Sequence, residues 1–184
     1  MRPGLLLIAR PSYLLRPPMV FISIYASIYA GCHPCGRRGE ADALELAQPL
    51  LTGRFLLLCA DDIHGARALA EAADCPLAIL AARHPEPQKF GVIEIRPDGT
   101  VHSLEEKPSA PTSNLVSTGA MVLDERIFTY EASRHANGER YLTDLLSALA
   151  VDAPVHIVLQ EEWIPVGYPA DIERAESILA ARAP

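Results

Sequence analysis

The chain has 184 residues, 49% of them apolar, and its 23 acidic residues against 16 basic ones give a net charge of −7 at neutral pH. This length suits one domain with a sizeable core and leaves no room for a second large domain. The acidic balance excludes general binding to a nucleic-acid backbone, which needs clustered Lys and Arg, whereas small anionic ligands can still bind through local basic groups.

Residues 1–38 form an atypical N-terminal segment, with arginines among prolines and leucines. The apolar run Met19–Tyr29 is shorter than the ~20 residues that a membrane-spanning helix needs, so no membrane association is expected. The run fits either the core of a secretory signal or a buried strand. The remainder of the chain is typical of a cytoplasmic protein, which argues against the signal and predicts a cytoplasmic location.

Four cysteines offer a second kind of chemistry. Cys32 and Cys35 have the Cys-x-x-Cys spacing of a low-pKa thiol pair or of half a zinc site. A zinc site needs a second pair of ligands, and Cys59 and Cys75 are far apart in apolar surroundings. The favoured interpretation is a chance pair together with two small buried side chains.

From residue 40 onward the chain shows regular patterns. Apolar residues recur at helical spacing in residues 40–51, where Pro49 should end or kink the helix. Residues 55–60 form a continuous apolar run, typical of a strand covered on both faces. An alanine-rich helix over residues 65–73 and a second apolar strand over residues 76–82 complete a βαβ unit, which predicts parallel strands in a doubly wound α/β sheet.

A hairpin follows. Residues 92–95 and 100–104 are β-prone, and Pro-Asp-Gly at positions 97–99 between them has the chemistry of a tight turn. Glu-Glu-Lys-Pro at positions 105–108 places charged side chains where the second strand must end, because proline cannot donate to a ladder. A third strand over residues 119–123 begins with a glycine, which leaves room for a close neighbour.

The C-terminal part continues with alternating elements. A helix is predicted over residues 124–131 with Asp124 as its N-cap, and a stronger one over residues 139–151, whose leucines form one apolar stripe. Residues 154–160 read as another strand. Pro169 opens a last helix, since proline suits the first helical position.

Polar residues at the ends of these elements are the candidates for chemistry. Asp61 and Asp62 directly follow the strand over residues 55–60, at the edge where α/β sheets bind ligands. Carboxylates there suit Mg²⁺, but an Asp pair that starts a turn or caps a helix fits the pattern equally well. Thr143 and Asp144 are expected to be caps or first-turn residues of their helix.

The ordered set of motifs resembles the sugar-phosphate nucleotidylyltransferases, which make nucleotide sugars. Phe90-Gly91-Val92, the hairpin, Glu105–Pro108 and Ser117-Thr118-Gly119 are similar to the sugar-binding half of that family. Upstream, the run Gly53–Asp62 resembles the family's strand ending in Gly-Asp-Asp, with Ala60 in the glycine's place. Downstream, the runs Gly138–Asp144 and Trp163–Asp171 match later landmarks. The resemblance covers Gly39 to Ala180.

The resemblance implies a fold and a reaction. The fold is an incomplete Rossmann-like doubly wound mixed sheet of the nucleotide-diphospho-sugar transferase type, with residues 39–184 as a truncated nucleotidyl transferase domain after the segment 1–38. The reaction is attack of a sugar-1-phosphate oxygen on the α-phosphorus of a nucleoside triphosphate, with release of pyrophosphate. It needs two anions held in line and cations to neutralise them.

The resemblance also implies residue roles. Asp61 would hold Mg²⁺, and Lys107 would hold the sugar phosphate, so these two are the expected catalytic residues. Glu106 would accept hydrogen bonds from sugar hydroxyls, and the backbone at Gly91 would approach the sugar. Residues Ser117, Thr118 and Gly119 complete the expected substrate-binding set. From the residues alone, Glu106 and Lys107 would be read as an exposed surface pair worth under ~1 kcal/mol.

Two departures from the family pattern bear on activity. The family opens with a Gly-rich loop that wraps the triphosphate, and nothing before Gly39 corresponds to it. In Trp-x-Asp-x-Gly the family supplies a second metal carboxylate, and here Pro165 stands at the aspartate's position. Both departures reduce the expected stabilisation of the transition state.

Three hypotheses therefore stay open. The first is a nucleotide-sugar-forming enzyme by descent, with its activity reduced or lost. The second is a non-catalytic sugar-phosphate-binding relative or truncated gene product. The third is an unrelated exported or redox α/β protein that uses Cys32 and Cys35. Uridine or thymidine with a hexose-1-phosphate is the default substrate pair by resemblance. An incomplete sheet would expose an edge strand, which favours a homo-oligomer.

Overall fold

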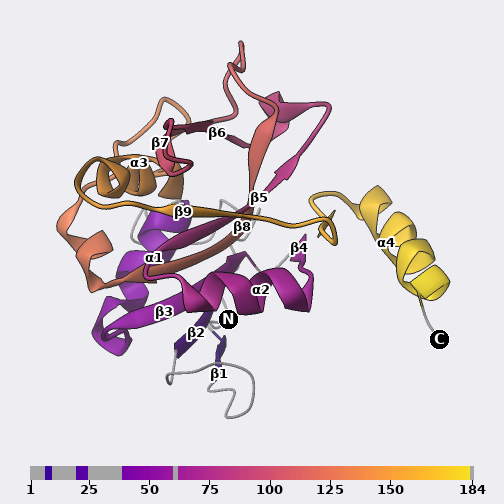
Figure 1. Ribbon diagram of the computed structural model, residues 1–184, viewed down its shortest axis with the longest axis horizontal. Coiled ribbons are helices and arrows are strands. Elements are labelled where there is room, and N and C mark those ends of the chain that lie inside the picture. Colours follow the sequence, from indigo (N-terminus) through magenta and orange to yellow (C-terminus); the bar gives the residue numbers. More distant parts are fainter. Residues whose placement is uncertain (1–6, 10–19, 25–38, 60–61, 183–184) are drawn as a thin grey trace.

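The computed structural model describes residues 7–9, 20–24, 39–59 and 62–182, which form a central sheet with helices on both faces (Figure 1). The strands are β1 (Leu7–Ala9), β2 (Val20–Ile24), β3 (Arg54–Cys59), β4 (Asp62–Ile63), β5 (Ala78–Arg83), β6 (Gly91–Ile95), β7 (Val101–Glu106), β8 (Leu115–Asp124), β9 (His156–Leu159) and β10 (Ile164–Pro165). The α-helices are α1 (Glu40–Ala47), α2 (Ala66–Asp74), α3 (Leu142–Asp152) and α4 (Pro169–Arg182), and the 3₁₀ helices are η1 (Gln48–Leu50), η2 (Pro87–Lys89) and η3 (Glu125–Thr129). The candidates Cys32, Cys35 and Asp61 lie outside the described residues.

The described strands form an eight-stranded sheet and a separate two-stranded one. The larger sheet has the order β1-β2-β3-β8-β5-β9, and the β6–β7 hairpin joins it where Val92 pairs with Val116 of β8. Strand β2 runs parallel to β3 and β9 parallel to β5, whereas β8 is antiparallel to β3 and β5. This arrangement confirms the predicted α/β class and the mixed sheet.

The βαβ prediction needs a correction, because β3 and β5 are not hydrogen-bonded to each other. Strand β8 lies between them, and its Val122 pairs with Leu56 of β3 on one side and with Ala78 of β5 on the other. The two strands therefore point the same way, as predicted, but with an antiparallel strand inserted. The hydrophobic periodicity of residues 55–82 cannot show that a strand lies between β3 and β5, since β8 comes from a later part of the chain.

Element bounds follow the local signals closely. Strand β2 lies within the apolar run Met19–Tyr29, which confirms the strand interpretation for residues 20–24. Helix α1 stops at Ala47, just before Pro49 in η1. The helix predicted after Asp124 is a single short 3₁₀ element, whose first turn Asp124 caps by accepting the backbone N–H of Arg126 at 3.0 Å.

Two predicted elements begin elsewhere than expected. Helix α3 starts at Leu142 and not at residue 139, because residues 139–141 lead into it in a non-helical conformation. Strand β8 starts at Leu115, so Gly119 lies in its middle with φ of 74°. The ladder to β5 slips at this place, where Ile79 pairs with Met121 but Ala81 pairs with Ser117. A slip of this kind bends a strand and re-aims its side chains.

The core has two parts, one on each face of the sheet. Phe55 and Leu57 of β3 point toward α1, α3 and η3, and Leu56 points toward α2, as the alternation of a strand requires. All three side chains are fully buried, which confirms the prediction of a strand covered on both faces. Helix α2 faces the sheet with alanines, Ala72 among them, so its backbone packs close to the strands.

The C-terminal helix α4 stands away from the sheet at one side of the molecule (Figure 1). Pro169 opens it, as predicted. No helix in the described part of the chain combines the length and apolar character that a membrane span needs.

Candidate functional site

The first residue of β6 lies at a closely packed point where four elements meet. Gly91 is buried and pairs with Glu106, the last residue of β7. A Cβ atom at Gly91 would lie 2.9 Å from Cγ2 of Thr143 in α3, 3.3 Å from Oε2 of Glu106 and 3.7 Å from Cβ of Ser117 in β8. Three side chains from different elements thus converge on a point that only a glycine leaves open.

Lys107 follows directly after β7 in an unusual backbone conformation. Its φ of 44° makes it the one non-glycine residue of the described chain with positive φ. Such a conformation costs of order 1–3 kcal/mol and tends to occur at functional sites. The backbone N–H of Lys107 donates to the carbonyl of Phe90 at 3.0 Å, which holds the residue beside Gly91. Its side chain is 62% exposed, with Nζ 3.5 Å from Oε1 of Glu106.

Burial and neighbouring negative charges disfavour the ionised form of two glutamates near Lys107. Burial raises the pKa of Glu106, and the charges of Glu139 and Asp144 raise it further against the opposing effect of Lys107. Burial likewise raises the pKa of Glu40, with Glu106 and Glu139 adding to the effect. Burial alone would lower the pKa of Lys107, but Glu106 and Glu40 outweigh it and the pKa rises. The lysine therefore stays protonated within an acidic environment.

The N-terminus of α1 reaches this site because it packs on the segment that precedes α3. Gly39 adopts φ of 103°, and a Cβ atom there would clash with the backbone of Arg140. The N–H of Ala41 donates to the carbonyl of Arg140 at 3.3 Å. This close backbone contact brings Glu40 next to Glu106 and Lys107, a neighbourhood that sequence spacing gives no hint of.

Arg140 fastens these two segments together. Its guanidinium lies 2.7 Å from Oδ1 of Asp42 and 2.6 Å from Oε1 of Glu45, both in α1, and its Nε donates to the carbonyl of Ala132 at 3.1 Å. The hydrogen bonds that Arg140 donates to Glu45 and Asp42 raise its pKa strongly. Arg140 therefore holds the site together and does not offer its charge to a ligand.

Thr143 is the residue that sequence reasoning missed. As expected, it lies with Asp144 in the first turn of α3, after the N-cap residue Tyr141. Thr143 is 7% exposed, and its hydroxyl is buried without a hydrogen-bond partner. Its neighbour Asp144 is engaged elsewhere, accepting the N–H of Ser133 at 3.0 Å and contacting Nε2 of His135 at 2.9 Å. Only the packing of α3 against β6 shows that Thr143 faces Gly91.

The expected Ser-Thr-Gly set is divided between the two faces of the sheet. Ser117 lies on the side of Gly91, and Gly119 lies against Cys59 of β3. Thr118 is fully buried on the opposite face, where its hydroxyl donates to the carbonyl of Leu80 at 3.0 Å and accepts from Gln160. Alternation along a strand separates neighbours in this way. The structure thus does not bring Thr118 to the site around Gly91.

The aspartate pair and the Trp-x-Pro-x-Gly landmark meet in the two-stranded sheet. Asp62 of β4 pairs with Pro165 of β10, and its carboxylate accepts from Nε1 of Trp163 at 2.9 Å and from the N–H of Val166 at 3.2 Å. Gly119 lies nearby, since a Cβ atom there would be 3.6 Å from Oδ2 of Asp62. The two motifs are therefore neighbours in space, although about a hundred residues separate them.

The described residues do not by themselves fit a magnesium site. Asp62 is hydrogen-bonded to Trp163 and Val166, and Pro165 has no side-chain ligand. No group of three His, Cys, Asp or Glu side chains in the described ranges is placed to hold a metal ion. Mg²⁺ at Asp61 stays a prediction.

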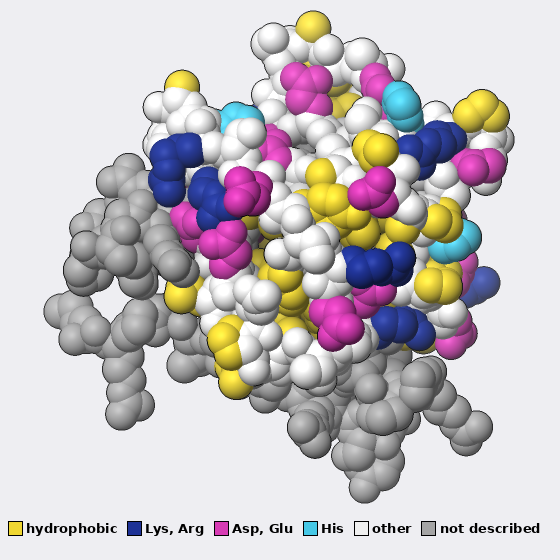
Figure 2. Space-filling view, turned by 90° about the vertical axis from the view of Figure 1, so that its left-hand side faces the viewer, with side chains coloured by type: hydrophobic (Ala, Val, Ile, Leu, Met, Phe, Trp, Pro, Cys, Tyr) yellow, Lys and Arg dark blue, Asp and Glu magenta, His cyan; other side chains and the backbone are white. Residues whose placement is uncertain are grey.

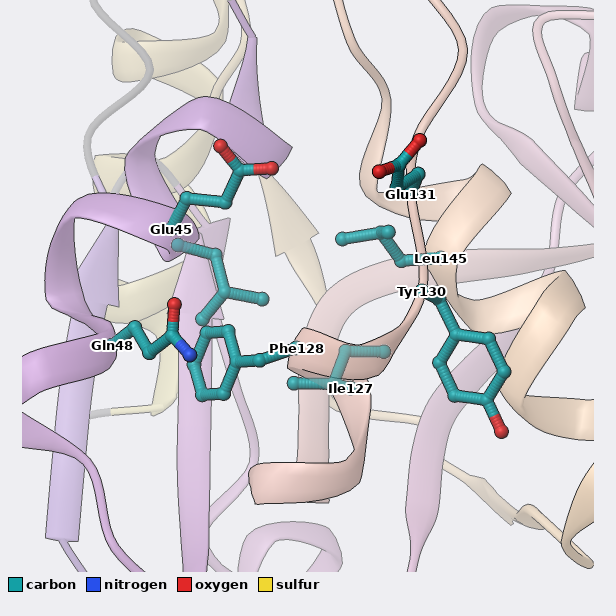
Figure 3. Close-up of a pocket in the computed structure, with 8 residues that line it drawn as sticks. Glu45, Gln48, Ile127, Phe128, Tyr130, Glu131 and Leu145 are labelled. Carbon is teal, nitrogen blue, oxygen red and sulfur yellow. The ribbon is translucent and has the colours of Figure 1, made fainter.

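A separate cavity of about 290 Å³ lies between α1, η3 and α3. Figure 3 shows the carboxylates of Glu45 and Glu131 on opposite sides of it, with Phe128 and Ile127 below. Glu45 is already paired with Arg140, and the hydroxyl of Tyr130 points away and donates to Asp152 at 2.7 Å. On the face seen in Figure 2, acidic and basic side chains are intermingled around hydrophobic ones. The cavity shows none of the convergence seen at Gly91.

Comparison with known proteins gives the family. A family model described as nucleotidyl transferase matches residues 27–182. The bifunctional protein GlmU of Methanocaldococcus jannaschii is 31% identical over 144 residues, which are 77% of this chain and 35% of that protein. The UTP–glucose-1-phosphate uridylyltransferase AglF of Haloferax volcanii is 25% identical over 176 residues, 87% of this chain and 72% of that one. The chain thus spans about a third of the length of the GlmU relative.

A solved structure shows the same fold. A crystal structure from Bacillus anthracis, assigned as a glucose-1-phosphate thymidylyltransferase in complex with sucrose, superposes with a TM-score of 0.62 at 23% identity. The match covers 75% of this chain and 59% of that one, and it confirms the expected sheet of the nucleotide-diphospho-sugar transferase type. Because the family model matches most of its length, the chain belongs to the nucleotidyl transferase family.

Proposed function

We propose that this chain makes a nucleotide sugar, by transferring a nucleotidyl group from a nucleoside triphosphate to a sugar-1-phosphate with release of pyrophosphate. Residues 39–184 would be the nucleotidyl transferase domain. The observation that carries the proposal is the pair of Glu106 and the protonated Lys107 at the end of β7, beside Gly91. A carboxylate acceptor and a cation side by side are parts that a sugar phosphate requires.

Each group has a role in binding. The carboxylate of Glu106 accepts hydrogen bonds from sugar hydroxyls. Gly91 lets the sugar ring approach the backbone of β6. Lys107 reaches the phosphate as a mobile point charge from its exposed position.

The proposed reaction needs no covalent intermediate with the protein. An oxygen of the sugar phosphate attacks the α-phosphorus of the triphosphate, a new P–O bond forms, and the bond to the pyrophosphate leaving group breaks. Lys107 holds the attacking phosphate in line and offsets its charge. The proposal includes Asp61 as the ligand of Mg²⁺, as the resemblance implies.

A second candidate function is sugar-phosphate binding without turnover. It is favoured by Pro165, which pairs with Asp62 at the position where the family pattern has a carboxylate. The sugar subsite around Gly91 does not depend on that position, so binding can persist when transfer is impaired.

The test combines pyrophosphate release with calorimetry. The chain is incubated with Mg²⁺, the common nucleoside triphosphates and a panel of sugar-1-phosphates, and Lys107→Ala is compared with Lys89→Ala. Lys89 is a matched control, because it is also exposed and pairs with a glutamate, Glu86, at 2.8 Å. Turnover that Lys107→Ala loses and Lys89→Ala keeps supports the transferase. Saturable binding without turnover selects the second candidate, and no heat with any sugar phosphate refutes both.

A further inference from the structure

Three aromatic rings meet between β6 and the two-stranded sheet. His84 directly follows β5, Phe90 directly precedes β6 and Trp163 directly precedes β10. The ring of Phe90 lies 4.6 Å from that of His84 and 5.2 Å from that of Trp163, measured between centroids, with planes inclined at 62° and 68°. The third pair, His84 and Trp163, is 6.1 Å apart. Rings attract each other in this edge-to-face arrangement, so the three residues form one packed unit, the aromatic cluster.

Asp62 fixes one end of the aromatic cluster. Its Oδ2 accepts the Nε1–H of Trp163 at 2.9 Å, and its Oδ1 accepts the N–H of Val166 at 3.2 Å. Asp62 also pairs with Pro165, so the residues that follow Trp163 are bound to β4 by the ladder as well. A hydrogen bond to a carboxylate is shorter and stronger than one between neutral groups. The indole of Trp163 is therefore held at a defined position relative to β4.

The other end of the aromatic cluster supports Lys107. The carbonyl of Phe90 accepts the N–H of Lys107 at 3.0 Å. Lys107 has φ of 44°, a strained conformation that persists only where the surrounding structure fixes it. The ring of Phe90 is packed against His84, which is itself fixed by two hydrogen bonds. The N–H of His84 donates to the carbonyl of Asn114 at 2.9 Å, and its Nδ1 accepts the N–H of Glu86 at 3.0 Å. The backbone of Lys107 thus rests on a residue that the aromatic cluster holds in place.

We propose that Trp163 is a positioning residue for sugar-phosphate binding and acts on Lys107 through Phe90. Its indole ties the backbone of that lysine to strand β4, which begins at Asp62. The inference rests on the function proposed above and adds a residue to its site. Coupling between two places in a protein is reciprocal, so a phosphate that binds Lys107 must also change the surroundings of Trp163.

Tryptophan fluorescence tests this coupling, because Trp163 is the only tryptophan of the chain. The full chain is titrated with a panel of hexose-1-phosphates that includes glucose-1-phosphate, and heat and emission are recorded in parallel. The emission of Trp163 should change saturably, with the same midpoint as the heat. Glucose without a phosphate should leave the emission unchanged. Lys107→Ala should lose both signals.

Variants at Phe90 locate the coupling in the aromatic cluster. Phe90→Leu removes the ring but keeps the carbonyl that accepts from Lys107, and it should weaken hexose-1-phosphate binding about tenfold and lose the emission change. Phe90→Tyr keeps the ring and should retain both. Phe128→Leu is the matched control, since Phe128 is also a partly buried phenylalanine in an aromatic pair, with its ring centroid 6.1 Å from that of Phe55. It should leave affinity and emission change as they are.

Variants at Trp163 separate its two contacts. Both Trp163→Leu and Trp163→Phe remove the N–H that Asp62 accepts, but only the phenylalanine keeps a ring beside Phe90. In calorimetry, Trp163→Leu should weaken binding about tenfold, and Trp163→Phe should recover part of that loss. A purely structural role in tying β10 to β4 predicts equal affinities for the two variants, since both lose the same hydrogen bond.

The outcomes separate this inference from the function on which it rests. Heat of binding without a change in the emission of Trp163 overturns the inference and leaves the sugar-phosphate site intact. Wild-type affinity in Phe90→Leu has the same consequence. No heat with any member of the panel refutes the proposed function and the inference with it. If the leucine variants do not fold, the emission of the unmodified chain decides the question alone.

Discussion

Gly91→Ala would place a methyl group in the closely packed point beside the candidate site. The new Cβ would lie 2.9 Å from Cγ2 of Thr143 and 3.3 Å from Oε2 of Glu106. Carbon atoms in contact are normally about 3.5–4.0 Å apart, so Thr143 or the strand must move by roughly 0.6 Å or more. The carboxylate of Glu106 can swing aside, but Thr143 is fixed in the first turn of α3.

The magnitude follows from this geometry. Overpacking in a tight interior costs about 1–3 kcal/mol, and the lower entropy of alanine in the unfolded chain returns about 0.4–1 kcal/mol. We expect a net loss of about 1 kcal/mol in the free energy of unfolding, which for a chain of this size lowers Tm by about 2–4 °C. Sugar-phosphate binding should weaken far more, by at least about tenfold, because the methyl displaces the carboxylate of Glu106 that the sugar needs.

Urea unfolding and calorimetry with a sugar-1-phosphate measure the two effects separately. Gly167→Ala is the control, since a Cβ atom there has no neighbour within 4 Å and the backbone is not in the left-handed region. The double variant Gly91→Ala with Thr143→Ser removes the methyl that clashes while it keeps the hydroxyl, and it should recover most of the stability but not the binding. Wild-type affinity in Gly91→Ala would refute the placement of the sugar at this glycine.

Three further predictions concern the groups that surround the site. Arg140→Ala should lower the free energy of unfolding by about 3 kcal/mol in chemical denaturation, because it leaves Asp42, 4% exposed, as a buried charge, and adding Asp42→Asn should restore part of the loss. Ser147→Ala should lower the free energy of unfolding by about 1–2 kcal/mol in thermal unfolding. The Ser147 hydroxyl accepts from the N–H of Leu104 and donates to the carbonyl of Leu104, both at 2.8 Å. An unchanged Tm would mean that water replaces the hydroxyl. Burial raises the pKa of Glu40 in the folded state, so the fold favours its protonated form and loses stability as the pH rises above about 4.5. Glu40→Gln should therefore stabilise the protein at neutral pH but not at pH 4. An equal effect at both pH values would contradict the burial of the charge.

Local patterns in the sequence were enough to place most elements and part of the site. The hairpin, the strand over residues 55–60 and the end of α1 before Pro49 follow from turn chemistry, apolar runs and proline sterics, which act between residues close in the chain. The charged residues Glu106 and Lys107 were placed at a strand end by the same reasoning. These features depend on interactions within a few residues, so a single sequence contains them.

What only the tertiary structure decided are contacts between distant segments. The insertion of β8 between β3 and β5 depends on ladder pairing across more than thirty residues, and hydrophobic periodicity is the same whichever neighbour a strand takes. The same holds for Thr143, a routine helix-start residue by pattern, which becomes a buried, unpartnered hydroxyl only because α3 packs on β6 beside Gly91. The acidic surroundings of Lys107 likewise arise where separate segments are packed together, since burial and charge coupling are properties of the assembled fold.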